Sequence, residues 1–154
     1  MSASWTPFRT IITTSADDLD AVAAELIPLL GSRTILLLEG PVGAGKTEFV
    51  KRLALKFGIS DSSSPSYAIH HRYHNAVSGA AFDHVDLYRL ESEDDLESTG
   101  FWDLFQSPEG LVVIEWPERM NVDYLPLNWK LIKIRIAKLE NSNEREISIL
   151  IKRP

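Results

Sequence analysis

The chain has 154 residues, of which 44% are hydrophobic and 25% charged, and it contains no cysteine. This length and composition are typical of a single folded domain over residues 1–154 and exclude a disordered chain. The lack of cysteine excludes disulfides, thiolate metal sites and a cysteine nucleophile. No apolar run approaches the roughly 20 residues that span a bilayer, and the first residues lack a signal-peptide pattern, so we expect a cytoplasmic protein without membrane contact.

The net charge of −6 is unevenly distributed along the chain. Residues 129–154 carry seven basic and three acidic residues, a net charge of +4, so the rest of the chain holds −10. Because a nucleic-acid backbone is negatively charged, an acidic chain is not expected to bind it over its whole surface. The basic segment has two interpretations: it is the solvated face of a terminal hairpin, or it is a contact surface for a partner or RNA.

The first elements predicted along the chain are a short strand and an amphipathic helix. Phe8–Thr13 is the strand candidate, and Ser15 with Asp18 can cap the helix that follows. Apolar residues at helical spacing continue to residue 30, where Pro28 loosens the last turn and Gly31 ends the helix.

A second strand and helix flank a glycine-rich loop. Thr34–Leu38 is apolar on both faces, as expected of a strand that is covered on two sides. After the loop, apolar residues recur at helical spacing from Phe49 to Phe57, and Gly58 closes the segment.

The second half of the chain predicts two hairpins that flank a short helix and a buried strand. Tyr67–Tyr73 and Ala81–Leu87 form the first hairpin around a turn at residues 75–79. Ser92 and Asp95 can cap a short helix near 96–105, and Leu111–Ile114 is a second buried strand. Isoleucines alternate with polar residues on both sides of a turn at 141–143, which indicates an antiparallel hairpin over about residues 129–152.

These elements together predict an α/β fold. We expect a P-loop NTPase-like three-layer sandwich with a mixed central sheet, in which parallel core strands are extended by antiparallel hairpins. A buried strand, a glycine loop and a helix follow one another in the order that a phosphate-binding loop requires.

The segment Gly40–Thr47 satisfies the pattern G-x-x-x-x-G-K-[ST]. Glycines let the backbone approach a ligand closely, so that main-chain N–H groups can converge on phosphate oxygens at the start of a helix. Lys46 would place its charge at the β- and γ-phosphates, and the Thr47 hydroxyl would be one ligand of Mg²⁺. The alternative is a glycine-rich turn without a ligand. The residues predicted to contact ATP in this loop are Pro41, Val42, Gly43, Ala44, Gly45, Lys46 and Thr47.

A metal held by Thr47 needs a second acidic ligand, and two carboxylates are candidates. Glu115 ends the aliphatic run 111–114, where a buried acid would need a cation or a hydrogen-bond partner. The alternative is that Glu115 begins an exposed turn with Pro117. Asp86 is the other candidate, because it would share a strand face with His84.

Histidine and tryptophan residues raise further possibilities, to which we give less weight. Four histidines occur in the first hairpin, but strand alternation directs His70 and His71 to opposite faces, which argues against a metal site other than Mg²⁺. Trp102 and Trp116 could stack on a base, although large aromatic residues in a small domain more often lie in the core or at an interface.

Four motifs in order resemble the bacterial TsaE family, the ATPases of tRNA threonylcarbamoyladenosine biosynthesis. They cover about residues 10–120, and one departure is visible: the family usually has Ser-Pro-Thr where this chain has Ser-Pro-Ser66. The motifs are the loop 40–47, Ser64-Pro65-Ser66-Tyr67, His84-Val85-Asp86-Leu87-Tyr88-Arg89-Leu90 and Glu115-Trp116-Pro117.

The resemblance implies an Mg²⁺-dependent ATPase that works with the partners TsaB and TsaD, which install threonylcarbamoyl on adenosine 37 of tRNAs reading codons that begin with A. It implies that Lys46 and Thr47 hold phosphate and Mg²⁺, that Glu115 is the acid at the metal, and that Asp86 is needed for turnover. Ser66 would belong to a loop that senses the γ-phosphate. Contact with tRNA would be indirect, through the partner complex.

Three other functions remain open at this stage. A small-molecule kinase would need an arginine-rich lid, which is not visible in the sequence, and a GTP switch would need an Asn-Lys-x-Asp pattern, which is absent. A nucleotide-dependent adaptor would bind ATP without hydrolysing it. Slow turnover stimulated by a partner is the prediction for the ATPase, since neither Arg89 nor Arg119 is a clear internal arginine finger.

Overall fold

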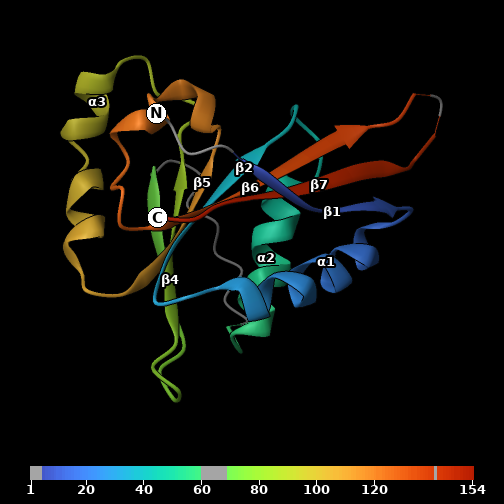
Figure 1. Cartoon of the computed structure of the whole chain (residues 1–154), viewed down its shortest axis with the longest axis horizontal. Coiled ribbons are helices and arrows are strands. Elements are labelled where there is room, and N and C mark those ends of the chain that lie inside the picture. The colour runs from blue at the N-terminus through green and yellow to red at the C-terminus, as the bar shows by residue number, and fades with distance from the viewer. Residues whose placement is uncertain (1–4, 60–68, 141) are drawn as a thin grey trace.

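The computed structural model describes residues 5–59, 69–140 and 142–154. Its centre is a seven-stranded sheet with the strand order β1-β7-β6-β2-β5-β4-β3 (Figure 1). The strands are β1 (Thr6–Thr13), β2 (Arg33–Glu39), β3 (His70–His74), β4 (Ala81–Asp86), β5 (Gly110–Glu115), β6 (Lys130–Lys138) and β7 (Arg145–Lys152).

The middle of the sheet is parallel and its two sides are antiparallel. Strands β6, β2, β5 and β4 run in one direction, whereas β7, β1 and β3 are antiparallel to their neighbours. This arrangement confirms the predicted mixed sheet. Because β2 lies between two parallel neighbours, all of its residues from Thr34 to Leu38 are buried. The carboxyl ends of the four parallel strands meet at one edge, where α/β proteins generally bind ligands.

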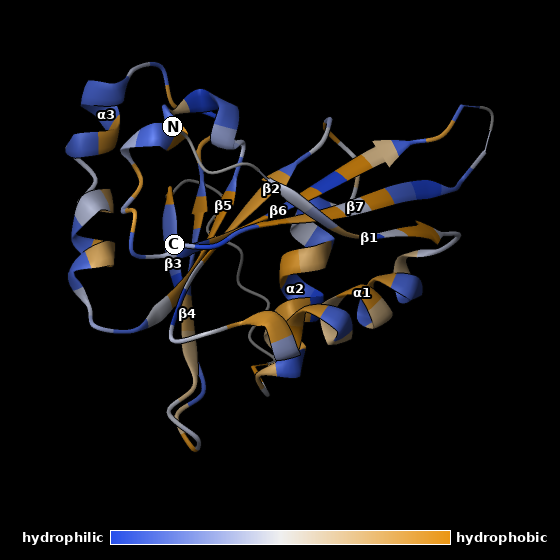
Figure 2. Cartoon of the chain, viewed as in Figure 1, coloured by the Kyte–Doolittle hydropathy of each residue, from blue (hydrophilic) through white to orange (hydrophobic). Residues whose placement is uncertain are grey.

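Helices lie on both sides of the sheet. Helices α1 (Leu19–Leu26) and α2 (Lys46–Lys56) pack on one face, and α3 (Glu93–Glu97) with the 3-10 segment η3 (Phe101–Gln106) lies on the other (Figure 1). Two clusters of buried apolar side chains fill the space between these layers and the sheet. Figure 2 shows hydrophobic residues concentrated in the central strands, whereas α3 is mostly hydrophilic.

Some predicted helix and strand bounds were wrong. The helix expected near 96–105 divides into α3 and η3, because Gly100 between them has a φ of 78° that ends a right-handed helix. The first helix ends at Leu26 and continues as a 3-10 turn that contains Pro28, as the sequence indicates. The strand expected at 67–73 is β3, and its first two predicted residues lie outside the described residues.

The C-terminal hairpin, β6 with β7, is confirmed as antiparallel. The sequence analysis missed its neighbours: β6 pairs with β2, and β7 pairs with β1. Several basic side chains of β6 have partners within the chain. Lys133 and Arg135 pair with Glu39, Lys130 donates to the carbonyl of Leu29, and Lys138 donates to that of Val42. Among the described residues, no helix has the length and apolar composition needed to cross a membrane.

Candidate functional site

The glycine loop leaves the carboxyl end of β2 and enters α2, as the sequence predicts. Gly40 passes the neighbouring strand so closely that a Cβ atom there would lie 2.7 Å from the backbone oxygen of Ile136. Gly45 precedes the first residue of α2 with a φ of 112°, a conformation that other residues rarely adopt. The loop therefore needs glycine at both positions.

Lys46 is buried at the start of α2. Its Nζ atom donates a hydrogen bond to the carbonyl oxygen of Gly40 at 2.5 Å and lies 3.3 Å from the ring centre of Trp116. Burial lowers the pKa of Lys46, while the negative charges of Glu115, Glu118 and Asp86 act in the opposite direction. The ammonium group therefore lies in an acidic, partly desolvated environment, where an added phosphate would be a strong partner.

Glu115 lies at the carboxyl end of β5, and only 2% of its surface is exposed. The Thr47 hydroxyl donates to its Oε1 atom at 3.3 Å, and Nε2 of His84 lies 2.6 Å from its Oε2 atom. This burial excludes the exposed turn that the sequence left open. Oxygen atoms of a hydroxyl and a carboxylate, side by side, are ligands that Mg²⁺ prefers, so Thr47 and Glu115 fit the predicted metal site.

Asp86 ends β4 directly beside Glu115, since the two residues are paired in the register of β4 and β5. The backbone N–H of Tyr88 donates to its Oδ1 atom at 3.0 Å, which fixes the direction of the half-buried carboxylate. Burial raises the pKa of Asp86, and the negative charge of Glu115 adds to this effect. The structure thus brings the second acidic candidate next to the first.

A cavity of about 350 Å³ joins most of the predicted site residues. Of the predicted loop contacts, Pro41 and Ala44 do not line it; the carbonyl of Pro41 accepts the N–H of Ala44 within the turn. Ser66 lies outside the described residues. The lining residues are Val42, Gly43, Gly45, Lys46, Thr47, Glu48, Asp86, Tyr88, Glu115 and Trp116.

A second cavity, of about 420 Å³, adjoins the first at the loop and was not predicted from the sequence. It shares Gly43, Gly45 and Glu48 with the first cavity, and Ala44 also lines it. The chain from the end of β1 to the start of α1 and the chain around the β6–β7 connection supply its remaining walls, so the cavity needs segments far apart in sequence to meet. Those other lining residues are Thr13, Thr14, Ser15, Ala16, Leu19, Asn143 and Arg145.

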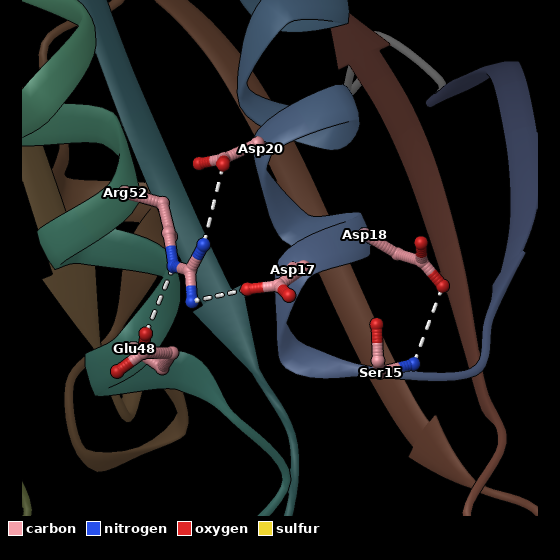
Figure 3. Close-up of polar contacts among 6 residues, drawn as sticks. All are labelled: Ser15, Asp17, Asp18, Asp20, Glu48 and Arg52. Carbon is pink, nitrogen blue, oxygen red and sulfur yellow. Dashed lines mark hydrogen bonds and ion pairs between the residues drawn. The ribbon is translucent and has the colours of Figure 1, made fainter.

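Arg52 of α2 connects the loop helix to α1 and to the turn before it (Figure 3). Its guanidinium nitrogens lie 2.9 Å from Glu48, 3.2 Å from Asp17 and 3.2 Å from Asp20. Glu48 borders both cavities, and the Asp18 carboxylate accepts the backbone N–H of Ser15 beside the second cavity. Arg52 therefore holds together two segments that line the site.

The other candidates from the sequence have separate surroundings. His70 pairs with Asp83 at 2.7 Å, whereas His84 contacts Glu115, so these two histidines do not converge. Trp102 packs against the core on the α3 side of the sheet, but Trp116 lines the first cavity. The sequence analysis named His84 only as a neighbour of Asp86, because pairing of β4 with β5 is not visible from local patterns.

The fold and this loop define an α/β protein of the P-loop NTPase-like class. The family described as "Threonylcarbamoyl adenosine biosynthesis protein TsaE" matches residues 13–147, which is most of the chain. The chain therefore belongs to the TsaE family, whose role lies in tRNA threonylcarbamoyladenosine biosynthesis.

Individual relatives agree with this assignment. The tRNA threonylcarbamoyladenosine biosynthesis protein TsaE of Treponema pallidum is 34% identical over 139 residues, which cover 90% of this chain and 97% of that protein. The Borreliella burgdorferi protein of the same description is 39% identical over 84 residues, 54% of this chain and 60% of that protein. The crystal structure of YdiB from Bacillus subtilis matches 97% of this chain and 88% of its own, with a TM-score of 0.71 and 26% identity.

Proposed function

We propose that this chain binds ATP with Mg²⁺ at the loop 40–47 and hydrolyses it slowly, as the ATPase that TsaB and TsaD require to form threonylcarbamoyladenosine at position 37 of tRNA. The observation that carries the proposal is the single cavity bordered by Lys46, Thr47, Asp86 and Glu115. Phosphoryl transfer needs groups such as a glycine loop, a buried cation and two carboxylates. Its transition state is stabilised mainly by positioning of the reacting groups and by electrostatic interactions.

Each side chain has a defined task in this proposal. Lys46 exchanges the carbonyl of Gly40 for a phosphate oxygen, and the loop amides bind the remaining oxygens. Mg²⁺, when held by Thr47 and Glu115, neutralises charge on the phosphate tail. Asp86, held by the N–H of Tyr88, orients the attacking water.

The nucleoside would occupy the second cavity. A triphosphate whose γ end lies beside Asp86 and Glu115 would extend along the loop past Gly43 and Gly45, where the first cavity meets the second. Hydroxyl and amide groups from residues 13–15 and from Asn143 supply hydrogen-bonding partners for a ribose or a base.

Slow basal turnover is part of the proposal. No arginine lines the first cavity among the described residues. Arg119 instead lies 5.8 Å from the ring centre of Tyr88 at the margin of the site. A P-loop protein without an inserted arginine is slower by about 10³–10⁵-fold, so a partner that supplies or positions one would stimulate turnover.

The proposed contact with tRNA is indirect, through the partner complex. The intramolecular partners of Lys130, Lys133, Arg135 and Lys138 support this view, because a surface for an RNA backbone should offer cations that are free to bind phosphate.

The proposal is tested by ATP consumption of the wild type and of Glu115→Gln, each alone and with TsaB and TsaD. Glu109→Gln is the matched control, because Glu109 precedes the opposite end of the same strand and is exposed. We expect Glu115→Gln to lose stimulated turnover by about 100-fold or more, while the control keeps it. Equal rates for all three proteins would refute the role of Glu115, and ATP binding without any turnover would favour an adaptor.

A second experiment tests the place in tRNA modification. Depletion of the protein from its host, followed by mass analysis of tRNA nucleosides, should reduce threonylcarbamoyladenosine. Rescue by the wild type but not by Glu115→Gln would connect this loss to the site. An unchanged level of the nucleoside would remove the proposed role with TsaB and TsaD and leave only nucleotide binding.

A further inference from the structure

His84 is a buried histidine for which the proposed reaction has no task. We propose that it is a positioning residue: it holds one oxygen of Glu115 so that the other oxygen stays directed at the Thr47 hydroxyl and at the metal. This inference rests on the proposed function, because it concerns how the carboxylate ligand of Mg²⁺ is oriented. Residues that orient metal ligands commonly affect metal affinity by 10–100-fold.

The sheet brings the two side chains together from adjacent parallel strands. His84 lies opposite Val113 in the β4–β5 register, two residues before Asp86, and its side chain is directed at the carboxylate of Glu115. Only 6% of the His84 side chain and 2% of the Glu115 side chain are exposed. The ring of Tyr73 lies 6.2 Å away and packs beside the imidazole. Burial and packing therefore confine both side chains.

The two oxygens of Glu115 have different partners. Oε2 lies 2.6 Å from Nε2 of His84, and Oε1 lies 3.3 Å from the Thr47 hydroxyl. A carboxylate only accepts hydrogen bonds, so Nε2 donates in this pair. The short contact at Oε2 fixes the rotation of the carboxylate group. The longer contact at Oε1 leaves lone-pair capacity for a cation. The imidazole thus selects which oxygen faces the phosphate loop.

Two substitutions separate the hydrogen bond from the bulk of the side chain. His84→Gln keeps an N–H donor near the position of Nε2, whereas His84→Leu keeps a similar volume without a donor. His71→Leu is the matched control, because His71 lies opposite His84 in the β3–β4 register and contacts Tyr73 but not Glu115. A role in packing alone predicts that the Leu and Gln variants behave alike.

The experiment is a calorimetric titration of ATP at a series of Mg²⁺ concentrations and in EDTA. For His84→Leu we expect the Mg²⁺ concentration at half-maximal enhancement of binding to rise about 10–100-fold. In EDTA its ATP affinity should stay within about threefold of the wild type, because the loop itself is intact. His84→Gln and His71→Leu should resemble the wild type. An unchanged Mg²⁺ requirement in His84→Leu, or an equal rise in His84→Gln, would overturn the inference.

If His84→Leu does not fold, His84→Asn takes its place, because its amide is too short to reach Oε2. We expect this variant to show the same rise in the Mg²⁺ concentration.

A double-mutant cycle tests the contact without nucleotide. It compares the Tm of the wild type, of one His84 variant (His84→Gln or His84→Asn), of Glu115→Gln and of the double variant. We expect the Tm shifts of the cycle with His84→Asn to be non-additive, and additive shifts would contradict the contact.

The outcomes distinguish this inference from the proposed function. A wild type that binds no ATP would refute the proposed function. A wild type that binds ATP with Mg²⁺, together with a His84→Leu variant that has the same Mg²⁺ requirement, would refute this inference alone.

Discussion

The two sides of the sheet use carboxylates in opposite ways. Glu39 and Glu115 end the neighbouring parallel strands β2 and β5 at the same edge. The Glu39 side chain is 30% exposed and faces β6, the strand that forms the antiparallel hairpin with β7; on this side, which we call the antiparallel side, Lys133 and Arg135 neutralise it at 3.7 and 2.8 Å. Glu115 is buried on the parallel side, and its contacts are a hydroxyl and an imidazole.

This difference separates a structural acid from an acid that can still bind a cation. A surface carboxylate with two cations contributes little and has no capacity for another. Burying a carboxylate without a lysine or arginine partner is costly, and such a group is retained where a function needs it. We therefore propose that the parallel side is the reactive side of this molecule.

The sharpest test of this division is Asp86→Asn. We expect turnover, stimulated by TsaB and TsaD, to fall by about 10²–10⁴-fold, because an amide cannot orient and activate water as a carboxylate does. ATP affinity should change by less than about threefold. Asp83→Asn is the comparison on the same strand: Asp83 pairs with His70 and Arg72, so its loss should lower stability rather than turnover of the folded protein. Equal losses of turnover in Asp86→Asn and Asp83→Asn would contradict the distinction between structural and reactive carboxylates.

Replacement of a lysine on each side tests the same idea through binding. Lys46→Ala should weaken MgATP affinity by about 10–100-fold, since a charge-assisted hydrogen bond to phosphate is worth about 1.5–3 kcal/mol. Lys133→Ala on the antiparallel side should change it by less than about threefold. Calorimetry with both variants measures this difference. A comparable loss of MgATP affinity in Lys133→Ala would show that a positive charge anywhere near this edge of the sheet supports binding.

The elevated pKa of Asp86 predicts a stability effect with a definite sign. Burial makes the carboxyl easier to protonate in the folded than in the unfolded chain, so the folded state binds more protons above the ordinary pKa of 3.8. Stability contributed by this group therefore falls as pH rises through that window and stays low at neutral pH. Nucleotide-free Asp86→Asn should unfold at a higher temperature than the wild type at pH 7.5, and the gap should shrink as pH falls. A gap that widens on acidification would contradict this assignment.

The smallest effect is expected at Glu39. Glu39→Gln removes the charge that two partly exposed ion pairs share and should lower the free energy of unfolding by at most about 1 kcal/mol, less in high salt. Urea unfolding at low and high ionic strength measures this change. A loss of several kcal/mol that is insensitive to salt would show that the antiparallel side also depends on a desolvated charge.

Sequence patterns located the polar residues of the first cavity better than the walls of the second. The loop 40–47, Glu115 and Asp86 are found from local motifs, because each ends a strand whose apolar pattern is visible. The contact of His84 with Glu115 requires the register of β4 and β5, which no local pattern specifies. The second cavity requires β1 to pair with β7 across most of the chain. The prediction of one helix at 96–105 was wrong. The apolar residues there have helical spacing, but the positive φ of Gly100 interrupts the helix.

The pairing of β1 (Thr6–Thr13) with β7 (Arg145–Lys152) also bears on how the protein is made. During synthesis β1 has no partner until β7 has left the ribosome, and β2 likewise waits for β5 and β6. Contacts between such distant segments slow folding and leave strand edges exposed in the meantime. In the nascent chain the second cavity, the proposed nucleoside site, would thus stay incomplete through most of translation and would close only as β7 joins the sheet.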